Sequence, residues 1–239
     1  MDSITILLEE PSYLVVNKPP GLFTQAASGI ESVETQLRSL LSSRPNAPHQ
    51  PFIGLPHRLD RGTSGILLIA RNQRALKRFC SQFESRIVRK LYLAVLENPL
   101  ETDEGTWVDW MRKIPEQAQA EIVPSEHPEA KKAVLHFKVL AKSKQQSLVQ
   151  IELETGRMHQ IRLQAATRGF PIVGDDLYGS CQSWDKQNVE GGKKSVALHA
   201  WKLEFRHPLT AVITKVAATV PASWNQLHSE WQEIIRHSS

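Results

Sequence analysis

Hydrophobic and polar positions along this chain follow two spacings, and each spacing predicts one type of element. Short apolar runs and strict alternation predict strands, which lie at 4–9, 13–17, 65–70, 90–96, 133–139, 148–153, 198–205 and 212–219. Apolar residues three or four positions apart predict helices, which lie near 31–43, from 72 to about 83, near 158–167 and around 224–235. A strand with a turn is expected at 171–178, and the polar segment 180–195 predicts a mobile loop.

The order of these elements predicts the fold class. Strands cluster and helices are few, and the two do not alternate as β-α-β units do. This arrangement favours an α+β fold with a mainly antiparallel sheet. No linker divides the 239 residues, so we expect a single domain over 1–239, which can comprise two lobes.

Composition excludes several classes of protein. Hydrophobic residues make up 41% and charged residues 23%, as in ordinary globular domains. No stretch approaches the ~20 apolar residues of a membrane helix, and the first residues lack the basic segment of a secretory signal. Cys80 and Cys181 lie far apart without a second cysteine nearby, which argues against a disulfide framework or a zinc ribbon. We therefore expect a cytoplasmic protein with two reduced thiols.

Positive charge is concentrated in one segment. The chain has a net charge of +4, but residues 57–90 contain nine basic and two acidic side chains, a net of +7. The segments on either side are slightly negative, at −2 before it and −1 after it. Such a concentration is typical of proteins that bind a polyanion, although a solvated helix face would give the same pattern.

The sequence contains few of the common chemical motifs. Neither nucleotide-binding glycine fingerprint occurs, and the histidines show no zinc-binding spacing. Asp175 and Asp176 follow a predicted strand and could bind magnesium, but a capped turn is the better interpretation. We therefore expect neither a metal nor a cofactor.

One segment stands out chemically. Asp60 lies between Arg58 and Arg61, directly before the predicted buried strand at 65–70. A carboxylate near guanidinium groups stays ionised, and an oriented, ionised carboxylate can act as a nucleophile. An Asp–Arg pair that only fixes the loop explains the same residues, so the pattern alone leaves both roles open.

The segment from His57 to Asp60, followed by Thr63-Ser64-Gly65, resembles the signature of the RluA-type pseudouridine synthases. Further segments resemble blocks of that family, and all occur in family order between about residue 10 and residue 208. They are Tyr13–Leu22, Lys90–Val95, Thr155–Arg162 with Gly169–Asp175, and Leu198–Ala200 with His207-Pro208.

The resemblance implies a fold and an activity. The fold is a mixed, mainly antiparallel sheet with flanking helices and a central catalytic cleft. The activity is the isomerisation of selected uridines in tRNA or rRNA to pseudouridine, which requires the nucleotide to be flipped out of structured RNA. No cofactor, metal or obligatory protein partner is implied.

The resemblance also implies roles for individual residues. Asp60 would be the nucleophile, attacking either the uracil ring or the anomeric carbon of the sugar. Arg162 would pair with Asp60, and Tyr92 would lie against the base and remove the proton from carbon 5. The residues expected to contact or support the RNA are Arg58, His57, Arg61 and Arg157.

The chain departs from many relatives in one respect. They have an additional N-terminal RNA-binding domain, whereas the catalytic pattern begins here within the first ~10 residues. We expect the catalytic domain itself or the shape of the RNA to select the target. This weakens an assignment to the large-subunit rRNA branch and keeps tRNA open.

Two other functions are considered. An RNA or nucleoside N-glycosidase would use two carboxylates, and Asp60 has no obvious acidic partner nearby in the sequence. A non-catalytic RNA-binding module would not need Asp60, Tyr92 and Arg162 together.

Overall fold

The computed structural model describes residues 4–45, 50–184 and 195–237. The strands are β1 (Thr5–Glu10), β2 (Tyr13–Lys18), β3 (Ser64–Ala70), β4 (Arg89–Glu97), β5 (Glu104–Lys113), β6 (Ala120–Ile122), β7 (Lys131–Lys142), β8 (Gln146–Leu153), β9 (Leu198–Arg206) and β10 (Ile213–Ala217). The helices are α1 (Val33–Ser42), α2 (Gln73–Glu84), α3 (Gln160–Ala166) and α4 (Ser229–His237).

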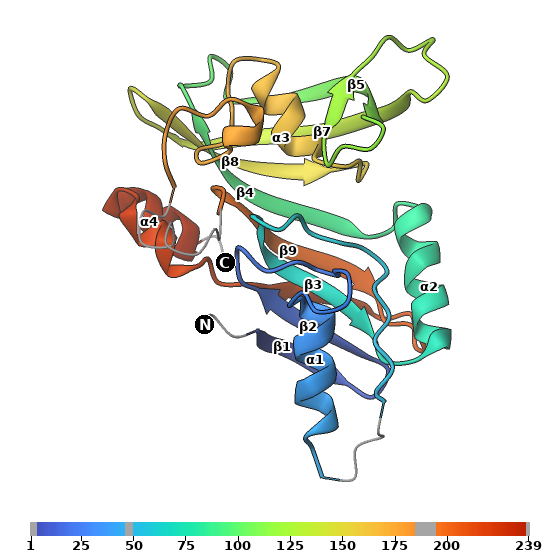
Figure 1. The fold of residues 1–239 in the computed structure, drawn as a ribbon. Helices are drawn as coiled ribbons and strands as arrows, with labels where there is room; N and C mark the ends of the chain where they lie inside the picture. Colours follow the sequence, from blue (N-terminus) through green and yellow to red (C-terminus); the bar gives the residue numbers. More distant parts are fainter. Residues whose placement is uncertain (1–3, 46–49, 185–194, 238–239) are drawn as a thin grey trace.

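The ten strands form one sheet, in the order β1-β2-β3-β9-β4-β8-β7-β5-β6, with β10 paired to β9. Figure 1 shows β4 between a part built from β1, β2, β3 and β9 and a part built from β8, β7 and β5. All pairings between these strands are antiparallel except that of β3 with β9. The predicted α+β class and the mixed, mainly antiparallel sheet are confirmed.

The parallel contact between β3 and β9 is short and depends on a glycine. Ser64 pairs with His199 and Gly65 with Ala200. Gly65 has a φ of +112°, and a Cβ atom there would stand 2.2 Å from the carbonyl oxygen of Ala200. Only glycine combines this backbone conformation with so close an approach. The contact joins β3, which follows the Asp60 turn, to the centre of the sheet.

Helix α2 forms where its amphipathic pattern predicts. The side chain of Asn72 accepts a hydrogen bond from the backbone N–H of Ala75 at 2.8 Å and so caps the first turn. Phe79 is fully buried and makes edge-on ring contacts with Tyr13 and Phe205. The opposite side presents exposed basic residues, namely Arg74, Lys77 and Arg78.

The C-terminal segment differs from the single predicted helix. A 3₁₀ helix at Ala222–Gln226 ends at Leu227, whose backbone is extended, and α4 begins only at Ser229. Leu227 leaves the helical conformation and is itself buried. Trp224 and Trp231 are 1% and 4% exposed, as expected for core residues.

Strands β5 and β6 are absent from the elements that the sequence predicts, although β5 has the residue pattern of a strand. In β5, Trp107 and Met111 are buried and Thr106 and Val108 are exposed, which is the alternation of a half-buried strand.

The segment 171–178 contains a single β-bridge, from Ile172 to Leu96, and a 3₁₀ helix at Asp176–Tyr178, rather than a full strand. Most of the loop expected at 180–195 lies outside the described residues.

Two predictions from composition can be compared with the structure. Within the described part of the chain, no helix is both long enough and apolar enough to span a membrane. Cys80 and Cys181 are free thiols.

Replacing Phe79 with alanine tests the packing of α2. The change leaves a cavity between the helix and the sheet, so the free energy of unfolding should fall by about 3–5 kcal/mol. Urea denaturation measures this loss. The matched variant Phe52→Ala removes a ring that is 39% exposed and should cost less than about 1 kcal/mol. Equal losses in the two variants would contradict the proposed packing.

Candidate active site

A buried lysine, Lys18, holds the Asp60 turn in place through hydrogen bonds to backbone carbonyls. The ammonium group of Lys18, which is fully buried, donates hydrogen bonds to the backbone carbonyls of Pro19, Leu22 and Arg61, at 2.9, 2.8 and 3.2 Å. Three N–H donors thus meet three acceptors from two separate segments. The turn itself closes through a hydrogen bond from the N–H of Thr63 to the carbonyl of Asp60 at 3.1 Å.

Arg162 joins the carboxylate of Asp60 to a second, buried carboxylate. Its Nε and Nη2 atoms donate to the two oxygens of Asp175, at 2.6 and 2.8 Å. Its Nη1 atom donates to Oδ2 of Asp60 at 3.2 Å. Asp175 is completely buried, and the side chain of Arg162 is 10% exposed, whereas that of Asp60 is 22% exposed. The bidentate pair therefore sets the orientation of the guanidinium, and its remaining edge faces Asp60.

Arg162 keeps its charge in this environment. Burial alone would lower its pKa, but the hydrogen bonds and negative charges of Asp175, followed by those of Asp60, outweigh burial and raise the pKa above its ordinary value. A permanent positive charge therefore lies beside Asp60.

A histidine lies close to Asp60, and a tyrosine contacts that histidine. Nε2 of His159 is 3.7 Å from Oδ1 of Asp60, and its Nδ1 is 2.9 Å from the hydroxyl of Tyr178. That hydroxyl also accepts a hydrogen bond from the N–H of Ala120 at 3.0 Å, and the Tyr178 ring lies 5.1 Å from the guanidinium carbon of Arg162. Burial lowers the pKa of His159, although Asp60 opposes this shift, so a neutral imidazole is favoured near neutral pH.

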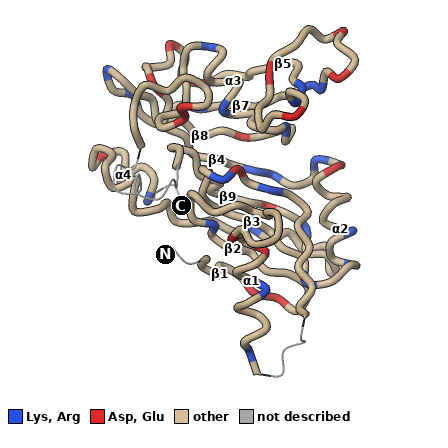
Figure 2. Tube along the Cα trace, viewed as in Figure 1, with Lys and Arg blue, Asp and Glu red and all other residues tan. Residues whose placement is uncertain are grey.

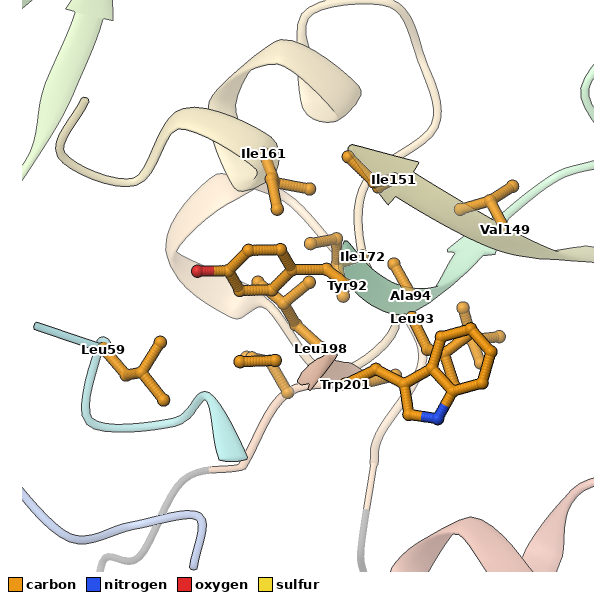
Figure 3. Close-up of a cluster of buried hydrophobic side chains, with 14 of the residues drawn as sticks. Leu59, Tyr92, Leu93, Ala94, Val149, Ile151, Ile161, Ile172, Leu198 and Trp201 are labelled. Atoms are coloured by element: carbon orange, nitrogen blue, oxygen red, sulfur yellow. The ribbon is translucent and has the colours of Figure 1, made fainter. Parts of the chain in front are cut away.

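A cavity of about 220 Å³ opens in front of these groups. Its wall includes Tyr92, Asp60 and Arg162, and in addition Arg58, Arg157, His159, Thr63, Leu153 and Leu198. Figure 3 shows the Tyr92 ring beside Leu198, Leu59 and Ile161, with its hydroxyl directed away from Leu93 and Trp201. Burial, and then the charge of Asp60, raise the pKa of Tyr92, so the phenol is protonated in the free protein.

The chemistry that this cavity can support is limited and specific. Among the described residues, Asp60 is the only carboxylate in its wall, and no group of three or more His, Cys, Asp or Glu side chains could hold a metal ion. An oriented carboxylate in a partly apolar pocket can act as a nucleophile toward a small planar ligand.

The chain was compared with known proteins. The family model described as RNA pseudouridylate synthase matches residues 12–167. The ribosomal large subunit pseudouridine synthase D of Xylella fastidiosa is 33% identical over 237 residues, which cover 96% of this chain and 70% of that protein. An uncharacterized RNA pseudouridine synthase of Zymomonas mobilis is 37% identical over 212 residues, covering 86% of this chain and 91% of that one.

The chain belongs to the RNA pseudouridylate synthase family. It is an RNA pseudouridine synthase, an isomerase that converts uridine in RNA to pseudouridine. The fold agrees with this assignment. The solved structure of human RNA pseudouridylate synthase domain containing 4 superposes with a TM-score of 0.73 at 21% identity, covering 92% of each chain. The solved structure of human RNA pseudouridylate synthase domain containing 1 superposes with a TM-score of 0.72 at 23% identity, covering 98% of this chain and 95% of that one.

The structure of this pseudouridine synthase brings most of the predicted site residues together. Asp60, Tyr92, Arg162, Arg58 and Arg157 all line the one cavity, although they come from separate parts of the chain. The cation that contacts Asp60 is Arg162, 102 positions away, rather than a neighbouring arginine.

The other two predicted residues, His57 and Arg61, are not part of the cavity wall. Nε2 of His57 accepts the backbone N–H of Leu68 at 2.9 Å, and its ring stacks on Phe83. Arg61 donates to the carbonyl of Gly21 at 3.1 Å, and its guanidinium lies over the ring of Phe23. Both residues thus make contacts that fix the loop around Asp60, and their contact with RNA stays a prediction.

The basic segment 57–90 is less positive in the fold than in the sequence. Figure 2 marks the Lys and Arg positions of the chain in blue and the Asp and Glu positions in red. Acidic residues from outside the segment form ion pairs with three of its arginines. The pairs are Arg71 with Glu9, Arg86 with Glu154 and Arg89 with Glu152. The segment as a whole is therefore not one uniform RNA-binding face.

Several residues of the site were not assigned a role from the sequence. The sequence favours a capped turn at Asp175. A 3₁₀ turn does follow it, but its side chain binds Arg162 and does not cap that turn. His159 and Lys18 lie inside the segments that resemble the family, whereas Tyr178 follows the nearest of them. Burial and hydrogen-bond partners decide their roles, and neither can be deduced from spacing.

Replacing Asp175 with asparagine tests its hold on Arg162. The change leaves a buried guanidinium without its bidentate partner, so the free energy of unfolding should fall by about 3–5 kcal/mol. Formation of pseudouridine should fall as well, because Arg162 loses its fixed orientation toward Asp60. Thermal unfolding and tritium release from [5-³H]uridine RNA measure the two effects. A stable, fully active variant would refute the role of this pair.

The pH dependence of stability tests the environment of His57. Burial, and then the positive charge of Lys90, lower the pKa of His57 to about 3, from an ordinary value of 6.5. Between these values the unfolded chain binds a proton that the folded chain does not, so stability falls as the pH falls, by about 1.4 kcal/mol per pH unit from this group.

The matched variant for this test is His57→Gln, whose amide oxygen can still accept the N–H of Leu68. Urea unfolding between about pH 4 and pH 6 should show a slope that is smaller than in the wild type by up to about 1.4 kcal/mol per pH unit. Parallel slopes would mean that His57 is not buried in its neutral form.

Proposed function

We propose that Asp60 is the nucleophile of this pseudouridine synthase. The observation that supports the assignment is its place as the only carboxylate among the described residues of the cavity wall, with Oδ2 bound to Arg162. Oδ1 is the oxygen left for attack, because the nearest nitrogen of His159 is 3.7 Å away, beyond hydrogen-bond distance. The attack is on the uracil ring or on the anomeric carbon.

Tyr92 is proposed to lie against the target base. In the reaction, the bond from N1 to the anomeric carbon breaks, a bond from carbon 5 to the same carbon forms, and the proton lost from carbon 5 is balanced by one gained at N1. Since the pKa of Tyr92 is raised and its phenol is protonated, Tyr92 must pass on its own proton as it accepts the one from carbon 5. Its apolar neighbours keep the detached uracil in place (Figure 3).

The proposed substrate is RNA of the large ribosomal subunit. Relatives from Xylella fastidiosa, Xanthomonas campestris and Vibrio vulnificus are named for that subunit. Transfer RNA is the other candidate and is an arm of the test. We further propose that residues 1–239 form one catalytic domain, because one sheet connects the ten strands of the described residues. The proposal also includes action in the cytoplasm without an obligatory protein partner.

The two other functions fit the geometry less well. An N-glycosidase of the usual kind needs a second carboxylate across the cavity, but Asp175 is fully buried and bound to Arg162 through both oxygens. A module that only binds RNA would have no use for a carboxylate at the floor of a pocket, where it repels phosphates.

Release of tritium from RNA labelled at carbon 5 of uridine tests the proposal. Large-subunit rRNA and tRNA, both lacking pseudouridine, are incubated separately with the wild type and with Asp60→Asn. We expect release from rRNA by the wild type and a loss of at least about 10³-fold in the variant, since a covalent step is removed. The matched control Asp103→Asn, at a side chain that is 85% exposed, should retain wild-type activity.

Other outcomes would change the proposal in defined ways. Release of tritium from tRNA alone would mean that the substrate is tRNA and not large-subunit rRNA. Free uracil in the supernatant would indicate an N-glycosidase. An Asp60→Asn variant as active as the wild type would refute the role of Asp60.

A further inference from the structure

The mouth of the cavity contains cations that lack an acidic partner. Arg157 lines the cavity together with Gly156. The ammonium of Lys90 lies above that glycine, since a Cβ atom at Gly156 would stand 3.7 Å from its Nζ. Among the described residues no carboxylate forms an ion pair with Lys90 or Arg157, whereas Arg86 nearby is paired with Glu154 at 2.7 Å.

The position of Lys90 on β4 relates it directly to the base-binding residue. Lys90 and Tyr92 are two positions apart on β4, and the register shift beside them leaves its additional residue on β9, so the alternation of β4 continues and the two side chains share a face. They are separated by about 7 Å along the strand. Tyr92 is buried and Lys90 only partly buried, which places Lys90 on the outer side of Tyr92.

The like charges around Lys90 are close enough to affect one another. Burial, and then the charges of Arg86 and Arg157, lower the pKa of Lys90 to about 8. A hydrogen bond from Nε of Arg157 to the carbonyl of Lys132, at 3.0 Å, fixes the Arg157 side chain. Arg157 therefore cannot move away from Lys90 without losing this bond. Such a group of cations is unfavourable by itself and becomes favourable when an anion joins it.

The size of the cavity indicates where an anion of the substrate would lie. Pockets that enclose drug-sized ligands measure about 300–1,000 Å³, and this one measures about 220 Å³. It suits a single flipped nucleoside, so the phosphates of that nucleotide must stay at the mouth. We propose that Lys90 and Arg157 form a subsite for the RNA phosphodiester next to the target uridine, an inference that rests on the proposed function.

The subsite can be tested through the salt dependence of RNA binding. The variants are Lys90→Gln and Arg157→Gln, with Lys90→Arg as the version that keeps the charge. The matched control is Lys144→Gln, an exposed lysine in the turn before β8, whose length separates it from the cavity by about 25 Å. The probe is a transcript of large-subunit rRNA, or tRNA if only tRNA releases tritium with the wild type.

Loss of one phosphate contact should weaken binding about 3–10-fold at ~0.1 M salt and reduce the slope of log K against log salt by about 0.7–0.9. We expect this for Lys90→Gln and for Arg157→Gln, but not for Lys90→Arg or Lys144→Gln. Slopes equal to that of the wild type in both glutamine variants would overturn the subsite. If Lys90→Gln fails to fold in a thermal unfolding test, Arg157→Gln, which lies outside the strands, decides the matter.

Failure of the subsite and failure of the proposed function give different results. Tritium release by the wild type is measured independently of the variants. Release with unchanged salt slopes refutes the subsite alone. If no release occurs with either RNA, the proposed function fails, and the subsite, which rests on it, fails too.

Discussion

The guanidinium of Arg162 is the interaction on which the rest of the site depends. It lies between two carboxylates, one fully buried and one facing the cavity. A buried charge is tolerated only when it is paired and hydrogen-bonded, and Asp175 supplies both conditions with two short contacts. Asp60 can therefore stay partly open to a ligand without leaving Arg162 unpaired. Asp175 thus stabilises the buried charge of Arg162, and Asp60 remains accessible to a ligand in the cavity.

The sheet determines where this pair can form. Arg162 comes from α3, which contacts the outer strand β6, whereas Asp60 precedes β3, in the part of the sheet on the other side of β4. Strands β4 and β9 lie between these parts, and they contribute Tyr92 and Leu198 to the cavity wall. Because Gly65 lets β3 approach β9 closely, the Asp60 turn that precedes β3 lies beside the end of β9 that contributes Leu198. The cavity wall therefore includes residues from both parts of the sheet and from β4, the strand between them in Figure 1.

Much of the fold could be predicted from the sequence, for reasons visible at particular residues. The alternation in β4 and the amphipathic pattern of α2 are local properties of the chain, and so is the signature around Asp60. The missed strand β5 shows the same alternation, so its pattern was present in the sequence. The inward turn of Asp175 toward Arg162 and the pairing of Arg86 with Glu154 could not be predicted. They depend on contacts between segments that only the folded chain brings together.

The separation of 102 positions between Asp60 and Arg162 has a consequence for the order in which the chain becomes functional during synthesis. Contacts between distant segments form late, because a long loop must close before they can contribute free energy. A nascent chain that ends before α3 already contains Asp60, the proposed nucleophile, but lacks both Arg162 and Asp175. Its Asp60 turn also lacks β9, which is synthesised last among the strands of the cavity wall. The groups around Asp60 therefore come together only after β9 has been synthesised.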